Sequence, residues 1–237
     1  MSRAKRKAKY QPREDNTINF NQAIKNRTIE LRPKSLNQEK LILNLLDESQ
    51  SIVVATGPAG TGKTYLAMLA AIKAFKAKEC ERIILTRPAV GVDDEKHGFL
   101  PGDLNSKMEP WTRPLFDVLR EYYTTKDIER MLESQTIEIS PLAYMRGRTF
   151  KNAYIVADEM QNATPSQTKM LMTRIGENSK IVITGDVEQA DRKTSDNGLI
   201  DLCSKLNAKP SPGLAVCYMT KTDIQRHPII DTVLSLY

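Results

Sequence analysis

The sequence predicts an α/β fold in which a mostly parallel sheet is covered by helices on both faces. Short, uniformly apolar and β-branched runs recur along the chain, and segments rich in strong helix formers lie between them. Strands that are apolar at every position belong to sheets buried on both sides, and such sheets are usually parallel. The length of 237 residues, without an internal repeat or a low-complexity linker, favours one folded domain over two.

Each expected element is recognised by its composition. The run 51–56 (SIVVAT) is apolar and β-branched, whereas 63–78 (KTYLAMLAAIKAFKAK) consists of good helix formers. Residues 88–114 contain several Pro and Gly residues, so we expect a long irregular excursion there. The expected strands are 51–56, 82–86, 136–139, 153–157, 180–184 and 214–218. The expected helices are 37–47, 63–78, 111–123, 127–133, 166–175, 199–206 and 229–236.

The composition is that of an ordinary soluble protein. Hydrophobic residues make up 40% of the chain, and no apolar run approaches the roughly 18 residues of a membrane-spanning helix. The basic amino terminus lacks the apolar stretch of a secretory signal, so we expect a cytoplasmic protein with no membrane partner. Cys80, Cys203 and Cys217 are widely spaced in apolar surroundings, which favours packing roles over a disulfide, a zinc site or a catalytic thiol.

The excess of positive charge is concentrated at the amino terminus. The formal net charge is +6, and residues 1–13 contain six Lys or Arg residues and no acidic residue. Such a segment can neutralise the phosphates of RNA or DNA, although it can equally be a solubilising terminus. We therefore expect a basic, disordered arm at 1–16 and one folded domain at 17–237.

The strongest motif lies between the first expected strand and the following helix. Residues 57–64 satisfy G-x-x-x-x-G-K-[ST] in the strand-to-helix context of a phosphate-binding P-loop. Glycines let successive backbone N–H groups surround a phosphate, and the helix directs its positive end at the same anion. Lys63 is expected to reach the β and γ phosphates, and Thr64 to bind Mg²⁺. The nucleotide-binding residues predicted here are Gly57, Pro58, Ala59, Gly60, Thr61, Gly62, Lys63 and Thr64.

Two acidic residues follow the expected strand 153–157. Asp158, at the end of that strand, is placed to hold Mg²⁺ through water, and Glu159 is placed to orient or polarise the attacking water. An acidic turn after a buried strand is the alternative. Together with the P-loop, the pair predicts a site for the hydrolysis of a nucleoside triphosphate.

Two further residues are candidates for the transition state. Gln189 follows the strand 180–184, where it can sense a γ-phosphate or the attacking water, unless this segment is only a Gly-Asp turn. Arg226, near the carboxyl terminus, can stabilise transition-state charge with its guanidinium group, although a surface role is the simpler alternative.

A GTPase is the main alternative for the nucleotide. The segment 220–223 (TKTD) follows a strand and is acceptable as a guanine-reading tetrapeptide. A GTPase should also have a glycine three residues after the aspartate of the second motif, and Gln161 stands there instead. This departure favours ATP.

The motifs in their order and spacing resemble the PhoH family of P-loop ATPases, which is related to superfamily 1 helicases. The resemblance runs from about Ser35 to the carboxyl terminus. Besides the P-loop, it is carried by Asn37-Gln38, Thr86-Arg87-Pro88-Ala89-Val90, Gly98-Phe99-Leu100-Pro101-Gly102-Asp103, Arg113-Pro114-Leu115, Tyr144-Met145-Arg146-Gly147-Arg148-Thr149-Phe150, Asp158-Glu159-Met160-Gln161-Asn162, Gly185-Asp186 with Gln189, and Arg226-His227-Pro228.

The resemblance implies a single RecA-like P-loop NTPase domain, in the short form without a PIN nuclease domain. It implies that Gln38 contacts adenine, and that Arg87 and the loop 98–103 lie near a nucleic-acid path or a subunit boundary. Related helicases place ATP between two such domains, so it also implies a homo-oligomer, a hexameric ring in which Arg226 or another arginine acts in cis or in trans. Met160 and the segment 190–193 depart from the family pattern, which affects packing and loop geometry.

We therefore expect Mg²⁺-dependent hydrolysis of ATP, coupled to binding or remodelling RNA or single-stranded DNA in a helicase-like manner. The first alternative is an ATP-controlled oligomeric interaction protein that does not translocate. The second is a metal-dependent nuclease built on the acidic residues 93–95, which are more simply a solvated loop.

Overall fold

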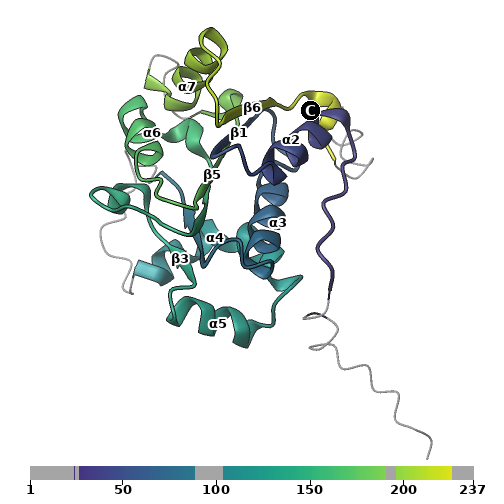
Figure 1. The fold of residues 1–237 in the computed structure, drawn as a ribbon, viewed down its shortest axis with the longest axis vertical. Coiled ribbons are helices and arrows are strands. Elements are labelled where there is room, and N and C mark those ends of the chain that lie inside the picture. Colours follow the sequence, from purple (N-terminus) through teal and green to yellow (C-terminus); the bar gives the residue numbers. More distant parts are fainter. Residues whose placement is uncertain (1–23, 25–26, 89–103, 191–195, 226–237) are drawn as a thin grey trace, which may run out of the picture.

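Six parallel strands form one sheet through the middle of the molecule (Figure 1). The computed structural model describes residues 24, 27–88, 104–190 and 196–225, and all statements below concern these ranges. The strands are β1 (Ile52–Thr56), β2 (Arg82–Thr86), β3 (Ile137–Ile139), β4 (Ala153–Ala157), β5 (Lys180–Gly185) and β6 (Leu214–Tyr218). Their order across the sheet is β3-β2-β4-β5-β1-β6, and every neighbouring pair is parallel. The predicted fold class is confirmed.

Helices cover both faces of the sheet, as alternating strand and helix segments require. Four helices pack on one face, where the small side chains of the Ala-rich helix α3 approach the strands closely. The other two pack on the opposite face, so the sheet is buried between two apolar layers. The helices are α2 (Leu36–Leu46), α3 (Lys63–Lys76), α4 (Leu104–Arg120), α5 (Thr125–Glu133), α6 (Pro165–Met172) and α7 (Gly198–Ala208).

Helix α4 corrects one expectation from the sequence. It begins at Leu104 and contains two prolines, whereas residues up to 114 were expected to be irregular. Proline removes a backbone hydrogen bond from a helix interior. Burial of Leu115, Val118 and Leu119 against α3 offsets that cost. The arm 1–16, the segment 89–103 and the expected helix 229–236 lie outside the described residues.

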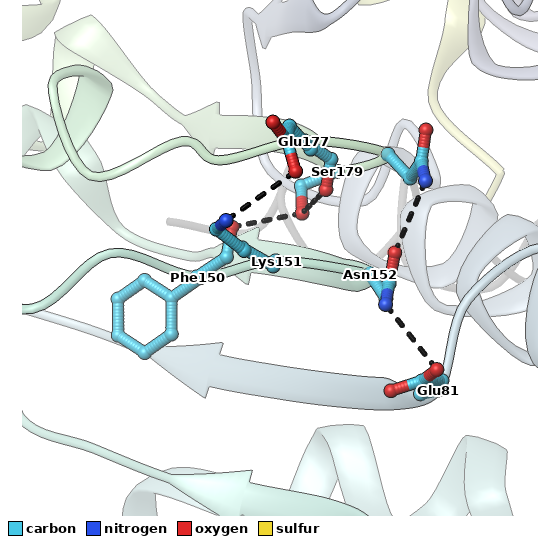
Figure 2. A network of polar contacts seen from close by, with 7 residues as sticks. Glu81, Phe150, Lys151, Asn152, Glu177 and Ser179 are labelled. Atoms are coloured by element: carbon cyan, nitrogen blue, oxygen red, sulfur yellow. Dashed lines mark hydrogen bonds and ion pairs between the residues drawn. The ribbon is translucent and has the colours of Figure 1, made fainter.

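Polar side chains join the turns at the amino ends of the strands (Figure 2). Asn152, just before β4, donates to Glu81 (3.2 Å) and accepts from Asn178 (3.2 Å). The hydroxyl of Ser179 donates to the carbonyl of Phe150 (2.9 Å). These bonds hold β2, β4 and β5 level with one another at this edge. None of the described helices is long and apolar enough to cross a bilayer.

Three of the predicted functional segments emerge at the opposite, carboxyl edge. The P-loop follows β1, Asp158 follows β4 and Asp186 follows β5. Because β4, β5 and β1 are neighbours in the sheet, three segments far apart in the sequence meet at one place.

Candidate active site

The P-loop connects β1 to α3 and needs glycine at its first residue. Gly57 has φ +137, and a Cβ atom there would lie 2.2 Å from the carbonyl oxygen of Met219. Hydrogen bonds to the ends of the two neighbouring strands, β5 and β6, hold the backbone of Gly57 in this close contact. Gly57 donates to the carbonyl of Gly185 (3.2 Å), and Met219 donates to that of Thr56 (2.7 Å). The loop therefore starts from a rigid position between β5 and β6.

Gln38 lies beneath the loop with its side-chain amide bonded at both ends. Its Nε2 donates to the carbonyl of Thr61 (3.0 Å), and its Oε1 accepts from the backbone N–H of Lys34 (2.8 Å). The residue is buried in the first turn of α2. In this structure Gln38 supports the loop backbone, and the contact with adenine that the family resemblance implies stays a prediction.

Lys63 is folded over the P-loop. Its ammonium group donates to the carbonyls of Gly57 (2.6 Å) and Pro58 (2.8 Å). Burial lowers the pKa of Lys63, and the nearby carboxylates of Asp186, Asp158 and Glu159 oppose that shift. The loop thus carries a buried cation at the position where phosphate charge is expected.

The side chains of Thr64, Asp158 and Thr184 meet at one carboxylate oxygen. One carboxylate oxygen of Asp158, Oδ1, accepts from the hydroxyls of Thr64 (2.8 Å) and Thr184 (2.6 Å). Hydroxyl and carboxylate oxygens are the hard donors that Mg²⁺ prefers. The donor set of Thr64 and Asp158 therefore fits this ion, with waters and phosphate oxygens as its remaining ligands.

Glu159 has a backbone conformation that is uncommon for residues other than glycine. Its φ of 56° and ψ of 36° place it in the left-handed region, which costs about 1 kcal/mol or more. Its carboxylate accepts a hydrogen bond from Nε2 of Gln161. The turn therefore directs the two carboxylates of the pair differently, with Asp158 bonded to Thr64 and Glu159 held by Gln161.

Gln161 and Asp186 form a link that the site predictions did not contain. Oε1 of Gln161 accepts from the backbone N–H of Asp186 (3.1 Å), and Oδ2 of Asp186 accepts from the N–H of Ala59 in the P-loop (3.0 Å). A Cβ at position 185 would lie 2.6 Å from Oε1 of Gln161, so Gly185 permits this approach. Hydrogen bonds thus run from Glu159 through Gln161 and Asp186 to the P-loop.

A cavity of about 270 Å³ at the carboxyl edge brings the predicted residues together. Its walls include Lys63, Thr64, Asp158 and Glu159, and the exposed Gln189 lies at its rim. A larger cavity of about 770 Å³ lies at the amino ends of the strands and contains none of these groups. The chemistry therefore belongs to the smaller one.

Three further sequence predictions are not tested by this cavity. Arg226 and the acidic segment 93–95 lie outside the described residues, and within these no cluster of three His, Cys, Asp or Glu residues could hold a metal ion. The carboxylate of Asp223, the last residue of the possible guanine-reading tetrapeptide, accepts from Asn37 (2.8 Å) and from Thr220 (2.7 Å). That carboxylate is buried in a structural contact.

Of the motif residues to which the sequence analysis assigned no role, Gln161 and Asp186 had the clearest signal. Asp186 follows β5 directly, and Gln161 lies four residues after the end of β4, at the edge where ligands bind in parallel sheets. Thr184 had a weaker sequence signal, because it lies inside β5 among apolar residues. Only the pairing of β4 with β5 places its hydroxyl beside Asp158.

Comparison with known proteins finds PhoH-like relatives. A PhoH-like protein of Synechocystis sp. is 42% identical over 207 residues, which cover 87% of this chain and 62% of that protein. A PhoH-like protein of Bacillus subtilis is 44% identical over 208 residues, covering 87% of this chain and 64% of that protein. The chain thus spans less than two thirds of the length of these relatives.

Among solved structures, the Sulfolobus solfataricus SWI2/SNF2 ATPase core in complex with dsDNA matches 83% of this chain and 47% of its own, with a TM-score of 0.47 and 16% identity. The PhoH-like protein family as a whole matches residues 30–237. With that match over most of the sequence and a P-loop on a parallel sheet, the chain belongs to the PhoH family.

Proposed function

We propose that this protein hydrolyses ATP with Mg²⁺ and couples hydrolysis to binding or remodelling RNA or single-stranded DNA. One observation carries the hydrolysis half of the proposal. Lys63, Thr64, Asp158 and Glu159 come from three segments and line one cavity at the carboxyl edge of the sheet. These side chains are the set that binding and cleavage of a phosphoanhydride require.

Nucleotide binding exchanges the partners of Lys63. In the structure its ammonium group is bonded to two backbone carbonyls, whereas phosphate oxygens carry full negative charge and are stronger acceptors. The backbone N–H groups of the loop and the amino end of α3 face the same anion. Lys63 therefore moves from the loop to the β and γ phosphates when ATP binds.

Hydrolysis assigns different work to the two carboxylates. Thr64 and Asp158 would hold Mg²⁺, and the ion would supply positive charge against the phosphate oxygens. Glu159 orients the attacking water and accepts its proton, while Gln161 holds the Glu159 carboxylate in place. Gln189 at the rim of the cavity contacts the γ-phosphate or the water, and Arg226 adds positive charge in the transition state.

Two contacts support ATP as the substrate. The carboxylate of Asp223 is occupied by Asn37 and Thr220, so it is not free to read guanine. Gln38 lies beside the P-loop with its Nε2 3.0 Å from the Thr61 carbonyl, close to where a base would emerge. Its amide retains a second N–H and a second lone pair for adenine.

The proposal includes a homo-oligomer, a ring of six chains in the cytoplasm. Leu36 and Leu43 lie seven residues apart on the same side of α2 and are 76% and 64% exposed. A neighbouring chain that covers them would also lie near the loop that Gln38 supports. The three cysteines are buried and unpaired, which supports a reducing compartment.

The nucleic-acid half of the proposal is supported by charge. The excess positive charge of the chain lies in residues 1–13, a segment suited to phosphate contacts. Deleting these residues should weaken nucleic-acid binding at low salt. Unchanged affinity would assign the segment a solubilising role.

The experiment that tests the function is steady-state ATP turnover, measured with and without single-stranded RNA and DNA. Glu159→Gln is the control, because it keeps the size and backbone of the residue but removes the base. We expect this variant to bind ATP and to hydrolyse it at least about 100-fold more slowly than the wild type. Stimulation by either polymer supports the coupling. Turnover that no polymer stimulates but Glu159→Gln abolishes would favour the ATP-controlled assembly, and equal turnover in both proteins would remove the site assignment.

A further inference from the structure

A short helix beside the carboxyl edge presents an exposed tyrosine. This helix, η1 (Leu142–Met145), follows β3, and Tyr144 on it is 61% exposed, more than Tyr65 or Tyr218. Arg146 comes directly after the helix and is also exposed, without an ion pair to any side chain in the described ranges. A single exposed side chain is ordinary. The backbone that carries these two is unusually well anchored.

Buried side chains fix η1 on both sides of Tyr144. Leu142 and Met145 are completely buried in the core that α6 and α7 cover. Beyond the helix, both terminal nitrogens of Arg148 bond to the carboxylate of Glu138, and its guanidinium carbon lies 4.5 Å from the centre of the Phe150 ring. Arg148 therefore has a structural role, and the backbone that carries the two exposed side chains is held in place by its neighbours.

The chemistry of the pair fits a single nucleic-acid strand. A tyrosine ring can stack on any unpaired base, and an arginine beside it can bind the phosphate that follows. Gly147, directly after Arg146, has φ +79, and apart from its chain neighbours no atom lies within 4 Å of the position that its Cβ would take, so a strand can approach closely. In a duplex the faces of the bases are already stacked, which leaves single-stranded RNA or DNA as the ligand.

Other tyrosines of the described surface are less suited to stacking. Tyr122 is buried, and Arg27 lies 5.4 Å from the centre of its ring. Tyr65 donates to Glu121 (3.5 Å), and Tyr218 accepts from Asn207 (2.7 Å). Tyr144 has no such partner among the described residues.

Backbone hydrogen bonds connect η1 to the candidate active site. The carbonyl of Arg87 accepts from Leu142 (3.1 Å), and the carbonyl of the preceding residue, Thr86, accepts from Asp158 (2.9 Å). The end of β2 thus contacts both η1 and the residue expected to hold Mg²⁺.

We propose that Tyr144 and Arg146 form a contact site for a single strand of RNA or DNA, with Tyr144 stacked on a base and Arg146 bound to phosphate. The inference rests on the nucleic-acid half of the proposed function and gives it a location on the molecule.

The test is fluorescence anisotropy of labelled oligo(U) and oligo(dT) of equal length, titrated with the full chain at several salt concentrations. The variants are Tyr144→Ala, Tyr144→Phe, Arg146→Ala and Arg146→Lys. Tyr218→Ala and Lys209→Ala are matched controls, because they remove an exposed tyrosine and an exposed positive charge at the β6 side of the molecule. Thermal unfolding of each variant checks its fold.

We expect Tyr144→Ala to weaken binding by about fivefold or more, and Tyr144→Phe to bind like the wild type, because stacking needs the ring and not the hydroxyl. Arg146→Ala should reduce the slope of log affinity against log salt by about 0.7, and Arg146→Lys should restore it. A loss seen with only one of the two oligomers supports the site and names the strand that it binds.

Three failures are distinguishable. A wild-type chain that binds neither oligonucleotide overturns the nucleic-acid half of the proposed function, and this inference with it. A wild-type chain that binds, together with Tyr144 and Arg146 variants that behave like the two controls, overturns the inference alone. If the Tyr144 or Arg146 variants change the sedimentation coefficient of the protein but bind the oligonucleotides normally, the inference is overturned as well, and the surface is a subunit contact.

Discussion

Lys63 has partners before any nucleotide arrives. Its ammonium group bonds to the carbonyls of Gly57 and Pro58, and it lies 3.4 Å from the hydroxyl of Thr61. A buried ammonium group without acceptors would cost several kcal/mol, so these contacts keep the charge and the shape of the loop in the free protein. ATP then finds a cation already in position and has only to replace two neutral acceptors.

The first prediction concerns this exchange. Lys63→Ala should weaken ATP binding about tenfold or more, because it removes hydrogen bonds to charged acceptors that are worth about 1.5–3 kcal/mol. Lys73→Ala, an exposed position on the same helix, should bind ATP like the wild type. Calorimetric titration with ATP measures both. Equal affinities for the three proteins would show that Lys63 does not contact the phosphates.

Gln161 is a positioning residue with two separable contacts. Its Nε2 donates to Glu159, and its Oε1 accepts the backbone N–H of Asp186. Gln161→Ala removes both, whereas Gln161→Glu removes the donor and keeps an acceptor for Asp186.

The second prediction follows from that division. Both Gln161 variants should lower kcat more than they change KM, because Glu159 loses its support. Gln161→Ala should also destabilise the fold, by about 1–3 kcal/mol, because it leaves a buried N–H without a partner, and Gln161→Glu should destabilise it because it buries a second carboxylate beside Glu159. Steady-state kinetics and denaturant unfolding separate the two effects. Normal kcat in Gln161→Glu would mean that Glu159 holds its position without this bond.

At the scale of elements, the turn η5 (Lys221–Asp223) fastens the end of β6 to the start of α2. Burial by itself raises the pKa of Asp223, but hydrogen bonds from Ser35, Asn37 and Thr220 outweigh it and lower that pKa to about 2. The carboxylate is thus ionised in the folded protein at pH values where the same group in the unfolded chain is protonated. This contact also fixes the helix that carries Gln38.

The third prediction is a pH dependence of stability. Since the folded pKa of Asp223 lies below its ordinary value of 3.8, the stabilisation is complete above about pH 4 and is lost as the pH falls toward 2. Asp223→Asn should therefore cost about 2 kcal/mol at neutral pH, and the difference from the wild type should shrink in acid. Urea unfolding at pH 7 and pH 3 measures it. Asp201→Asn, on the surface of α7, is the control, and an equal loss in both variants would contradict the assignment.

At the scale of the whole molecule, the cavity lies open at the carboxyl edge of a single sheet. The guanidinium expected in the transition state is not among the described residues. In the proposed ring, a neighbouring chain lies beside every site and can cover the nucleotide there.

The fourth prediction tests that arrangement. ATP turnover per chain should fall on dilution in parallel with dissociation of the oligomer, followed by sedimentation at the same concentrations. Mixing Glu159→Gln with Arg226→Ala should restore part of the activity if the arginine acts on a neighbour's site, because some interfaces then contain both intact residues. Full activity in a monomer would contradict the ring, and strictly additive activity in the mixture would place the arginine in cis.

The sequence by itself determined the fold class, the P-loop and the acidic pair. The alternation of apolar strands with helices predicted a parallel sheet, and the P-loop is one contiguous motif whose glycines act through local backbone geometry. The family was also recognisable from motifs in order, and that recognition is confirmed. These features are local, so neighbouring residues suffice to specify them.

Only the tertiary structure decided which distant groups touch. Gln38 bonds to Thr61 because α2 packs against α3, and Gln161 joins Glu159 to Asp186 because β4 and β5 are neighbours in the sheet. Packing against α3 allowed helix α4 to form through its prolines. In each case the deciding energy is burial or a hydrogen bond between residues far apart in the sequence, and such partners are fixed only when the sheet assembles.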